Sequence, residues 1–117
     1  MLICDDERHI VRLLQVNLER QGSEVVRAFS GEEAIKLLES SDVPGQPSFN
    51  LAVIDAKMPG IDGNEVLKWI RTHESTRMVR VILMIPRGED RETWEQGSFQ
   101  ADKYVVKPFN PMEILSY

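Results

Sequence analysis

The sequence lacks the features that mark secreted and membrane-spanning proteins. It contains a single cysteine, Cys4, so no internal disulfide can form, and the apolar residues before it predict a buried free thiol. The longest purely apolar stretch, Val81–Ile85, is far shorter than the roughly 20 residues that a membrane helix needs. The first residues show neither the basic segment nor the long apolar segment of a signal peptide. These absences predict a cytoplasmic protein that does not span a membrane.

Positive charge is also scarce. Fourteen lysines and arginines stand against 19 aspartates and glutamates, a formal net charge of −5. No overall basic field would attract DNA or RNA, so we expect no nucleic-acid binding by this domain. Apolar residues make up 42% of the chain and charged residues 28%, which is the composition of a globular protein. A length of 117 residues suits one domain, residues 1–117, with one fold and one site.

Short apolar runs alternate with longer amphipathic stretches along the whole chain. This rhythm is typical of an α/β protein, in which a parallel sheet is flanked by helices. Three of the runs are almost continuously apolar, as strands covered on both faces are. The five predicted strands are Met1–Cys4, Glu24–Phe29, Leu51–Ile54, Val79–Ile85 and Lys103–Val106.

Apolar residues at helical spacing predict a helix after each of the first three strands. The first helix should end near Gly22, because glycine suits the left-handed conformation that often follows a helix. The second should begin at a capping box, in which Ser30 is followed three residues later by Glu33. The third follows a turn-rich connection over residues 58–63.

The remaining elements are less regular. A fourth helix is expected over Arg91–Phe99, weakened by Gly97. Asn110 and the proline after it are an N-cap and a first helical residue, but the fifth helix they begin is cut short at Tyr117. We therefore expect the chain to be a fragment of a longer protein. Residues 40–50, which contain two prolines and a glycine, predict a surface loop.

Charged residues follow or close three of the predicted strands. Asp5 and Asp6 follow the first, Asp55 the third and Lys107 the fifth. Since ligands of open parallel sheets bind beyond the carboxyl ends of the strands, these side chains should converge at one edge. Crowded carboxylates repel one another unless a cation compensates, and Mg²⁺ (or Mn²⁺) prefers such oxygen ligands. For any one residue alone, a simpler role is equally consistent: a helix N-cap for each acid and a solvated surface charge for Lys107. The four together favour a site.

Four short motifs stand in a fixed order along the chain: Asp5-Asp6-Glu7, residues 55–63 (DAKMPGIDG), Ala101-Asp102-Lys103-Tyr104, and Lys107-Pro108-Phe109. In order and separation they resemble the receiver domain of two-component response regulators. The resemblance covers essentially the whole chain. It implies a doubly wound, three-layer (βα)5 fold whose five-stranded parallel sheet has the order 2-1-3-4-5.

The resemblance also implies a role for each site residue. Asp55 would be the phosphoacceptor, Asp5 and Asp6 acidic residues of the metal site, and Lys107 a contact to the phosphoryl group. The backbone carbonyl of Lys57 would complete the protein's share of the Mg²⁺ shell. The implied function is a phosphorelay step, in which a histidine kinase or phosphotransfer protein phosphorylates Asp55. No enzymatic activity is expected beyond the domain's own phosphorylation and dephosphorylation.

Two residues depart from the pattern of the family. Ile85 stands where Thr or Ser is usual, and it has no hydroxyl to offer the phosphoryl group; Pro86 follows where a small residue is usual, and it has no backbone N–H. Tyr104 occupies the position of the family's switch aromatic, although a half-buried core tyrosine would look the same. We expect phosphorylation to proceed but to shift the conformation less than in a typical receiver.

The resemblance places the partner surface on the helix near Arg91–Phe99, the strand Lys103–Val106 and the helix that begins at Asn110. An output domain or a separate partner would bind there. The resemblance also allows a homodimer, but the sequence does not define the oligomeric state.

The sequence also bears on three other functions. A pseudo-receiver, which binds partners without phosphorylation, is favoured by Ile85 and Pro86, whereas the retained Asp5, Asp6, Asp55 and Lys107 argue against it. A phosphatase of the haloacid dehalogenase type requires two aspartates separated by one residue, whereas Asp5 and Asp6 are adjacent. A flavin-binding module requires a phosphate-binding loop after the first strand, and none follows. The two histidines, His9 and His73, lack a second ligand at zinc spacing and are predicted to lie on the surface.

Overall fold

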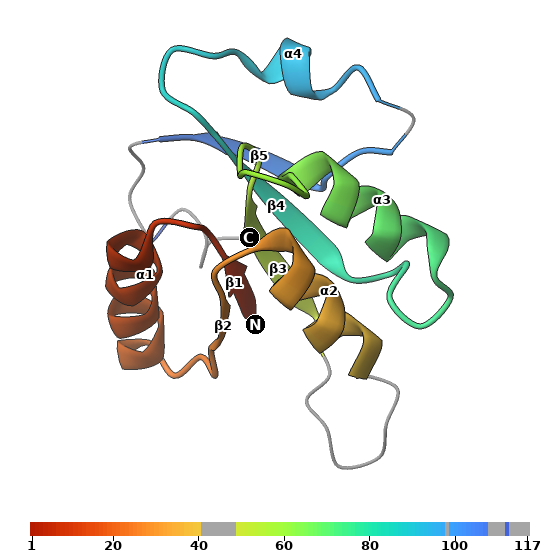
Figure 1. Ribbon diagram of the computed structural model, residues 1–117. Helices are drawn as coiled ribbons and strands as arrows, with labels where there is room; N and C mark the ends of the chain where they lie inside the picture. Colours follow the sequence, from red (N-terminus) through yellow and green to blue (C-terminus); the bar gives the residue numbers. More distant parts are fainter. Residues whose placement is uncertain (41–48, 98, 108–111, 113–117) are drawn as a thin grey trace.

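The computed structural model describes residues 1–40, 49–97, 99–107 and 112. In this part of the chain, five strands form one parallel sheet in the order β2-β1-β3-β4-β5 (Figure 1). The strands are β1 (Leu2–Cys4), β2 (Val26–Ala28), β3 (Leu51–Asp55), β4 (Arg80–Ile85) and β5 (Lys103–Val106). The predicted α/β class and strand order are confirmed.

Helices cover both faces of this sheet. They are α1 (Arg8–Arg20), α2 (Gly31–Glu39), α3 (Gly63–Thr72) and the short α4 (Arg91–Trp94). Successive residues of a strand point to opposite faces, so Ile82 packs in one core with α1 and Leu83 packs in the other with α2 and α3. Figure 1 shows α1 on one side of the sheet and α2 and α3 on the other. Within the described residues, no helix has the length and apolar character needed to cross a membrane.

The predicted ends of the first two helices are confirmed. Gly22 has a φ of +93°, and its N–H donates to the Glu19 carbonyl at 3.0 Å, which closes the end of α1. At the start of α2, the Ser30 hydroxyl accepts a hydrogen bond from the Glu33 N–H at 3.1 Å. The Glu33 carboxylate in turn accepts from the Phe29 N–H, one residue before the N-cap. The capping interaction therefore also anchors the chain that enters the helix.

The fourth helix and the second strand are shorter than predicted. α4 ends at Trp94 and not at Phe99, because none of its residues is buried and so short a helix has little stability without packing. β2 covers Val26–Ala28 and not Glu24–Phe29. It lies at the edge of the sheet and pairs only with the three residues of β1, which sets its length.

Two predicted segments fall largely outside the described residues. The fifth helix, predicted from Asn110, is one of them, and so its shortened length stays a prediction. The loop predicted over residues 40–50 is the other, since 41–48 are not described. Phe49 belonged to that prediction, yet it is only 8% exposed and packs into the core beneath α2 and α3.

Candidate functional site

The carboxyl ends of three strands bring the predicted charged residues together. Asp5 follows β1, Asp55 is the last residue of β3, and Lys107 follows β5. Carboxylate oxygens of Asp5, Asp6 and Asp55 all lie within 4.8 Å of one another. The Lys107 Nζ lies 2.9 Å from Asp5 Oδ2 and 3.3 Å from Asp55 Oδ2. The predicted convergence of these four residues at one edge of the sheet is thus confirmed.

The three carboxylates differ in exposure and in hydrogen bonding. Asp5 is fully buried, and both of its oxygens are engaged: Oδ1 accepts from the Glu7 N–H at 3.0 Å and Oδ2 from Lys107 Nζ. The N-cap role considered for a single acid does not apply to Asp5, because the N-cap of α1 is Glu7. Asp55 is 3% exposed, whereas Asp6 is open to solvent.

Electrostatics favour a cation at this cluster. Burial and the neighbouring Asp5 charge raise the pKa of Asp55 to about 7, although Lys107 partly offsets them. Burial alone would lower the pKa of Lys107, but its contacts with Asp5 and Asp55 outweigh burial and raise it. When all three carboxylates are ionised, the one lysine leaves two negative charges without compensation. An all-oxygen donor set with this charge fits a hard divalent cation such as Mg²⁺.

The loop after Asp55 is packed tightly against the strand. The Gly63 N–H donates to the Ala56 carbonyl at 2.9 Å. A Cβ atom on Gly63 would lie 2.5 Å from the Asp55 carbonyl oxygen, so only glycine fits here. Asp62 caps α3 by accepting from the Glu65 N–H at 2.9 Å. The start of α3 therefore supports Asp55 directly, a close approach that the turn predicted over residues 58–63 did not include.

A further acidic residue, Glu89, contacts both the loop after Asp55 and α4, and the sequence pattern did not predict these contacts. Lys57 is exposed, and its Nζ lies 3.6 Å from Glu89 Oε2. The other Glu89 oxygen accepts a hydrogen bond from Trp94 Nε1 at 3.2 Å. Glu89 thus links the loop after Asp55 to α4. No sequence signal marks it, because a glutamate in a loop is most often only a solvated charge.

The two residues that depart from the receiver pattern lie next to Lys107. Ile85 is fully buried as the last residue of β4, and its carbonyl accepts a hydrogen bond from the Lys107 N–H at 2.9 Å. Pro86 follows it and is partly exposed. The Ile85 backbone is therefore hydrogen-bonded to Lys107 of the site, while the Ile85 side chain is apolar.

Tyr104 lies on β5, the strand that leads to Lys107. It is half-buried, and its hydroxyl accepts a hydrogen bond from the Ala101 N–H at 3.1 Å. The Arg91 guanidinium carbon lies 5.2 Å from the centre of the Tyr104 ring, a cation–π distance. Tyr104 therefore connects β5 to α4, and its role as a switch stays a prediction.

The remaining candidates take no part in the cluster. Cys4 is a buried free thiol, as predicted, and burial together with Asp5 and Asp55 raises its pKa to about 12. His9 is exposed, and His73 is exposed and stacked on Trp69 at 3.8 Å between ring centres. The prediction that both histidines lie on the surface is confirmed.

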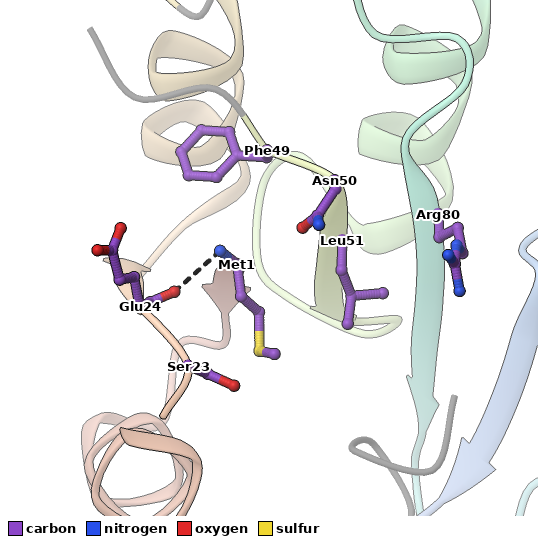
Figure 2. Close-up of a pocket in the computed structure, with 7 residues that line it drawn as sticks. All are labelled: Met1, Ser23, Glu24, Phe49, Asn50, Leu51 and Arg80. Atoms are coloured by element: carbon purple, nitrogen blue, oxygen red, sulfur yellow. Dashed lines mark hydrogen bonds between the residues drawn. The ribbon is translucent and has the colours of Figure 1, made fainter. Parts of the chain in front are cut away.

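A pocket of about 550 Å³ lies at the opposite, amino-terminal edge of the sheet. Figure 2 shows that its lining comes from residues at or before the starts of β1, β2, β3 and β4, namely Met1, Ser23, Glu24, Phe49, Asn50, Leu51 and Arg80. This lining includes one carboxylate and no histidine or cysteine. The pocket therefore lacks the cluster of three carboxylates that the carboxyl-terminal edge provides, and the latter is the better candidate site.

Comparison with known proteins identifies the family of the chain. The family model described as "Response regulator receiver domain" matches residues 1–117. Among curated proteins, the chain is 38% identical over 114 residues to the alkaline phosphatase synthesis transcriptional regulatory protein PhoP of Bacillus subtilis. It is 36% identical over 116 residues to the transcriptional regulatory protein ResD of the same organism. These alignments cover 97% and 98% of the chain but 44% of each relative, so the chain spans less than half their length.

Solved structures give the same result. The response regulator TrrA of Thermotoga maritima, solved in complex with Mg²⁺-BeF, is 35% identical with a TM-score of 0.79, over 98% of this chain and 91% of that one. The chemotaxis response regulator CheY4 of Vibrio cholerae is 26% identical with a TM-score of 0.84, over the same shares of the two chains. From its strand order, its acidic edge and these matches, we conclude that the chain belongs to the family of response regulator receiver domains, which are signalling modules.

Proposed function

We propose that Asp55 accepts a phosphoryl group from a partner histidine kinase or phosphotransfer protein, in a reaction that requires Mg²⁺ or Mn²⁺. The observation that carries this proposal is the convergence of Asp5, Asp6 and Lys107 on Asp55. The complex of the similar TrrA with Mg²⁺-BeF supports the choice of metal. The phosphorylated state would control an output domain or a partner protein.

Each residue has a role in this proposal. Asp6, Asp55 and the backbone carbonyl of Lys57 would hold the cation, while Asp5 holds Lys107 in place through its buried Oδ2. When bound, the cation supplies positive charge that stabilises the phosphoryl oxygens during transfer. An Asp55 oxygen forms the new bond to phosphorus as the bond from phosphorus to the donor nitrogen breaks, and the electron pair of that bond stays on the nitrogen.

Because the pKa of Asp55 is raised, a bound cation would have a second effect: it would favour the ionised form of this carboxylate. A protonated carboxyl is a poor nucleophile, and without a cation Asp55 holds its proton up to about pH 7. Positive charge beside the carboxylate favours its ionised form. Lys107 supplies one such charge, and a divalent cation would supply the larger part.

The lengths and names of the relatives support a proposal about the rest of the protein. We infer that residues 1–117 form one domain of a longer cytoplasmic protein, because the matched relatives are more than twice as long as their matched segments. Their names as transcriptional regulatory proteins support an output domain that acts on transcription. The surface of α4, β5 and the helix predicted from Asn110 would transmit the signal, to that output domain, to a partner or to a second copy.

A pseudo-receiver is the second candidate. Ile85 and Pro86 support it, because neither side chain can form a polar contact with a phosphoryl group and Pro86 has no backbone N–H. Such a domain would bind partners through the same surfaces in one conformation. The retained Asp5, Asp6, Asp55 and Lys107 count against it.

Incubation with Mg²⁺ and acetyl phosphate separates these candidates. Intact-mass measurement should show the gain of one phosphoryl group in the native chain and no gain in Asp55→Asn. Chelation of the metal should abolish the gain. If the folded native chain gains no mass in the presence of Mg²⁺, the phosphoacceptor proposal is wrong and the pseudo-receiver is correct.

A further inference from the structure

A pocket of about 390 Å³ lies between the start of α1 and β2, outside the carboxylate site. Arg8 and Arg12 line it from α1, Arg27 lines it from β2, and the Phe29 ring lies among them. All three arginines are exposed. Figure 1 shows α1 beside the end of the sheet that β2 and β1 form. We call Arg8, Arg12 and Arg27 the arginine cluster.

The aromatic ring orders this cluster. The Arg8 guanidinium carbon lies 4.2 Å from the centre of the Phe29 ring, and that of Arg27 lies 6.0 Å from it. Such cation–π contacts restrict the guanidinium planes while their N–H groups stay available for other partners. An ordered guanidinium binds a carboxylate in a bidentate manner and loses less side-chain entropy than a mobile lysine would.

The cluster has no acidic counterpart in the part of the chain that the structure describes. Among the described residues, no ion pair joins Arg8, Arg12 or Arg27 to a carboxylate, although the chain carries a net charge of −5. Other arginines do pair: Arg71 binds Asp102 at 2.8 Å. Three cations that line one pocket repel one another. An anionic partner would relieve this repulsion and would be complementary in charge to the surface.

We propose that the arginine cluster is a docking site for an acidic segment of a partner protein. Arg8 and Arg12 are one helical turn apart, and Arg27 faces them from the strand, so the three guanidiniums match several neighbouring carboxylates better than one small anion. The Arg8 guanidinium already covers one face of the Phe29 ring, so that face is not available to stack on a nucleotide base. Only Glu7 separates Arg8 from Asp6, so a partner bound here lies beside the carboxylate edge.

Binding of a synthetic peptide of consecutive glutamates tests the proposal. It is measured by calorimetry at low ionic strength on the 117-residue chain. Replacement of the cluster, Arg8→Gln with Arg12→Gln and Arg27→Gln, should weaken binding about tenfold, because three exposed ion pairs are lost. The matched control, Lys36→Gln with Arg20→Gln and Arg77→Gln, removes the same charge from other exposed positions and should leave binding unchanged. Circular dichroism confirms that both variants are folded.

Three results would overturn the proposal. One is the absence of peptide binding to the native chain at low salt. Another is an equal loss of binding in both triple variants, which would reveal only an effect of net charge. The third is tighter binding of inorganic phosphate, or of phosphatidylglycerol vesicles, than of the peptide. Labelling of Asp55 by acetyl phosphate needs none of these arginines, so the proposed function is tested independently in the same variants.

Discussion

At the scale of single residues, exposure divides the three carboxylates into different roles. Asp5 has no exposed surface, and its two oxygens already bind the Glu7 N–H and Lys107. Asp6 is exposed and adjacent to Asp55 in space. Mg²⁺ takes only one or two protein carboxylates and keeps several waters. We therefore expect Asp6 and Asp55 to be the direct ligands of a bound cation, with Asp5 behind them.

The first prediction concerns Asp6. Asp6→Ala should weaken Mg²⁺ binding by about tenfold or more, since even residues behind the direct ligands contribute that much to metal affinity. Isothermal titration of the metal-free chain measures the effect. Glu74→Ala removes a carboxylate from another exposed position and should keep the native affinity. An unchanged affinity in Asp6→Ala would remove Asp6 from the set of ligands.

At the scale of elements, the connection from β3 to α3 holds β3, the strand that ends at Asp55, against a helix. The second prediction concerns the contact at its centre. Gly63→Ala should lower the free energy of unfolding by about 1–3 kcal/mol, because the new Cβ would lie 2.5 Å from the Asp55 carbonyl oxygen and 2.7 Å from the Ala56 Cα. Urea unfolding measures the change.

Gly97→Ala is the matched control for this substitution. Its Cβ would meet nothing closer than the Phe99 carbonyl oxygen at 3.8 Å, and the φ of Gly97 is not positive. We expect its stability to equal that of the native chain or exceed it slightly. Equal stability of Gly63→Ala and the native chain would show that the loop relaxes and does not support Asp55.

Elements with local signals were predictable from the sequence, and elements that depend on packing were not. The Ser30 cap and the Gly22 end of α1 depend on neighbouring residues, so a one-dimensional pattern predicted both. α4 depends on burial that it does not have, and its predicted extent to Phe99 was wrong. The extent of β2 depends on the length of its partner strand, which no local pattern encodes.

The same distinction applies to the site. Parallel strands end at a common edge, so the positions of Asp5, Asp55 and Lys107 in the sequence were enough to predict their convergence. The arginine cluster and Glu89 combine residues from different elements, and no spacing along the chain predicts such contacts. The sequence did reveal the departures at Ile85 and Pro86, because they could be counted from Lys107.

At the scale of the whole molecule, the site affects stability through the buried Asp55 charge. Its folded pKa of about 7 lies above the value of about 3.9 expected in the unfolded chain. The folded state therefore holds this proton more tightly, and the stabilisation is complete below about pH 4 and lost as the pH rises through about 7. The third prediction is that metal-free Asp55→Asn is more stable than the native chain at pH 8, by roughly 2–4 kcal/mol.

Urea unfolding in a chelator from pH 4 to pH 8 measures this difference, which should vanish at the acid end. Asp90→Asn is a control of opposite sign, because the Thr93 N–H bond at the start of α4 lowers the pKa of Asp90. Its carboxylate stabilises the fold at high pH and loses that effect on acidification. If Asp55→Asn is no more stable than the native chain at pH 8, the burial of Asp55 does not strain the metal-free fold.

The fourth prediction is that phosphorylation moves α4 and β5 less in this chain than a hydroxyl at position 85 would allow. A ligand shifts a two-state equilibrium only by its differential affinity for the two states, and the Ile85 side chain can form no hydrogen bond that favours one of them. Such a bond to a charged group is worth about 1.5–3 kcal/mol, a tenfold change or more in the ratio of states. We therefore expect the Tyr104 hydroxyl to keep its hydrogen bond from the Ala101 N–H when Asp55 is phosphorylated. Beryllofluoride should therefore change the amide spectrum around Tyr104 only weakly in the native chain and strongly in Ile85→Thr with Pro86→Ala. Full shifts in the native chain, with nothing added by the double variant, would show that coupling does not depend on these two residues.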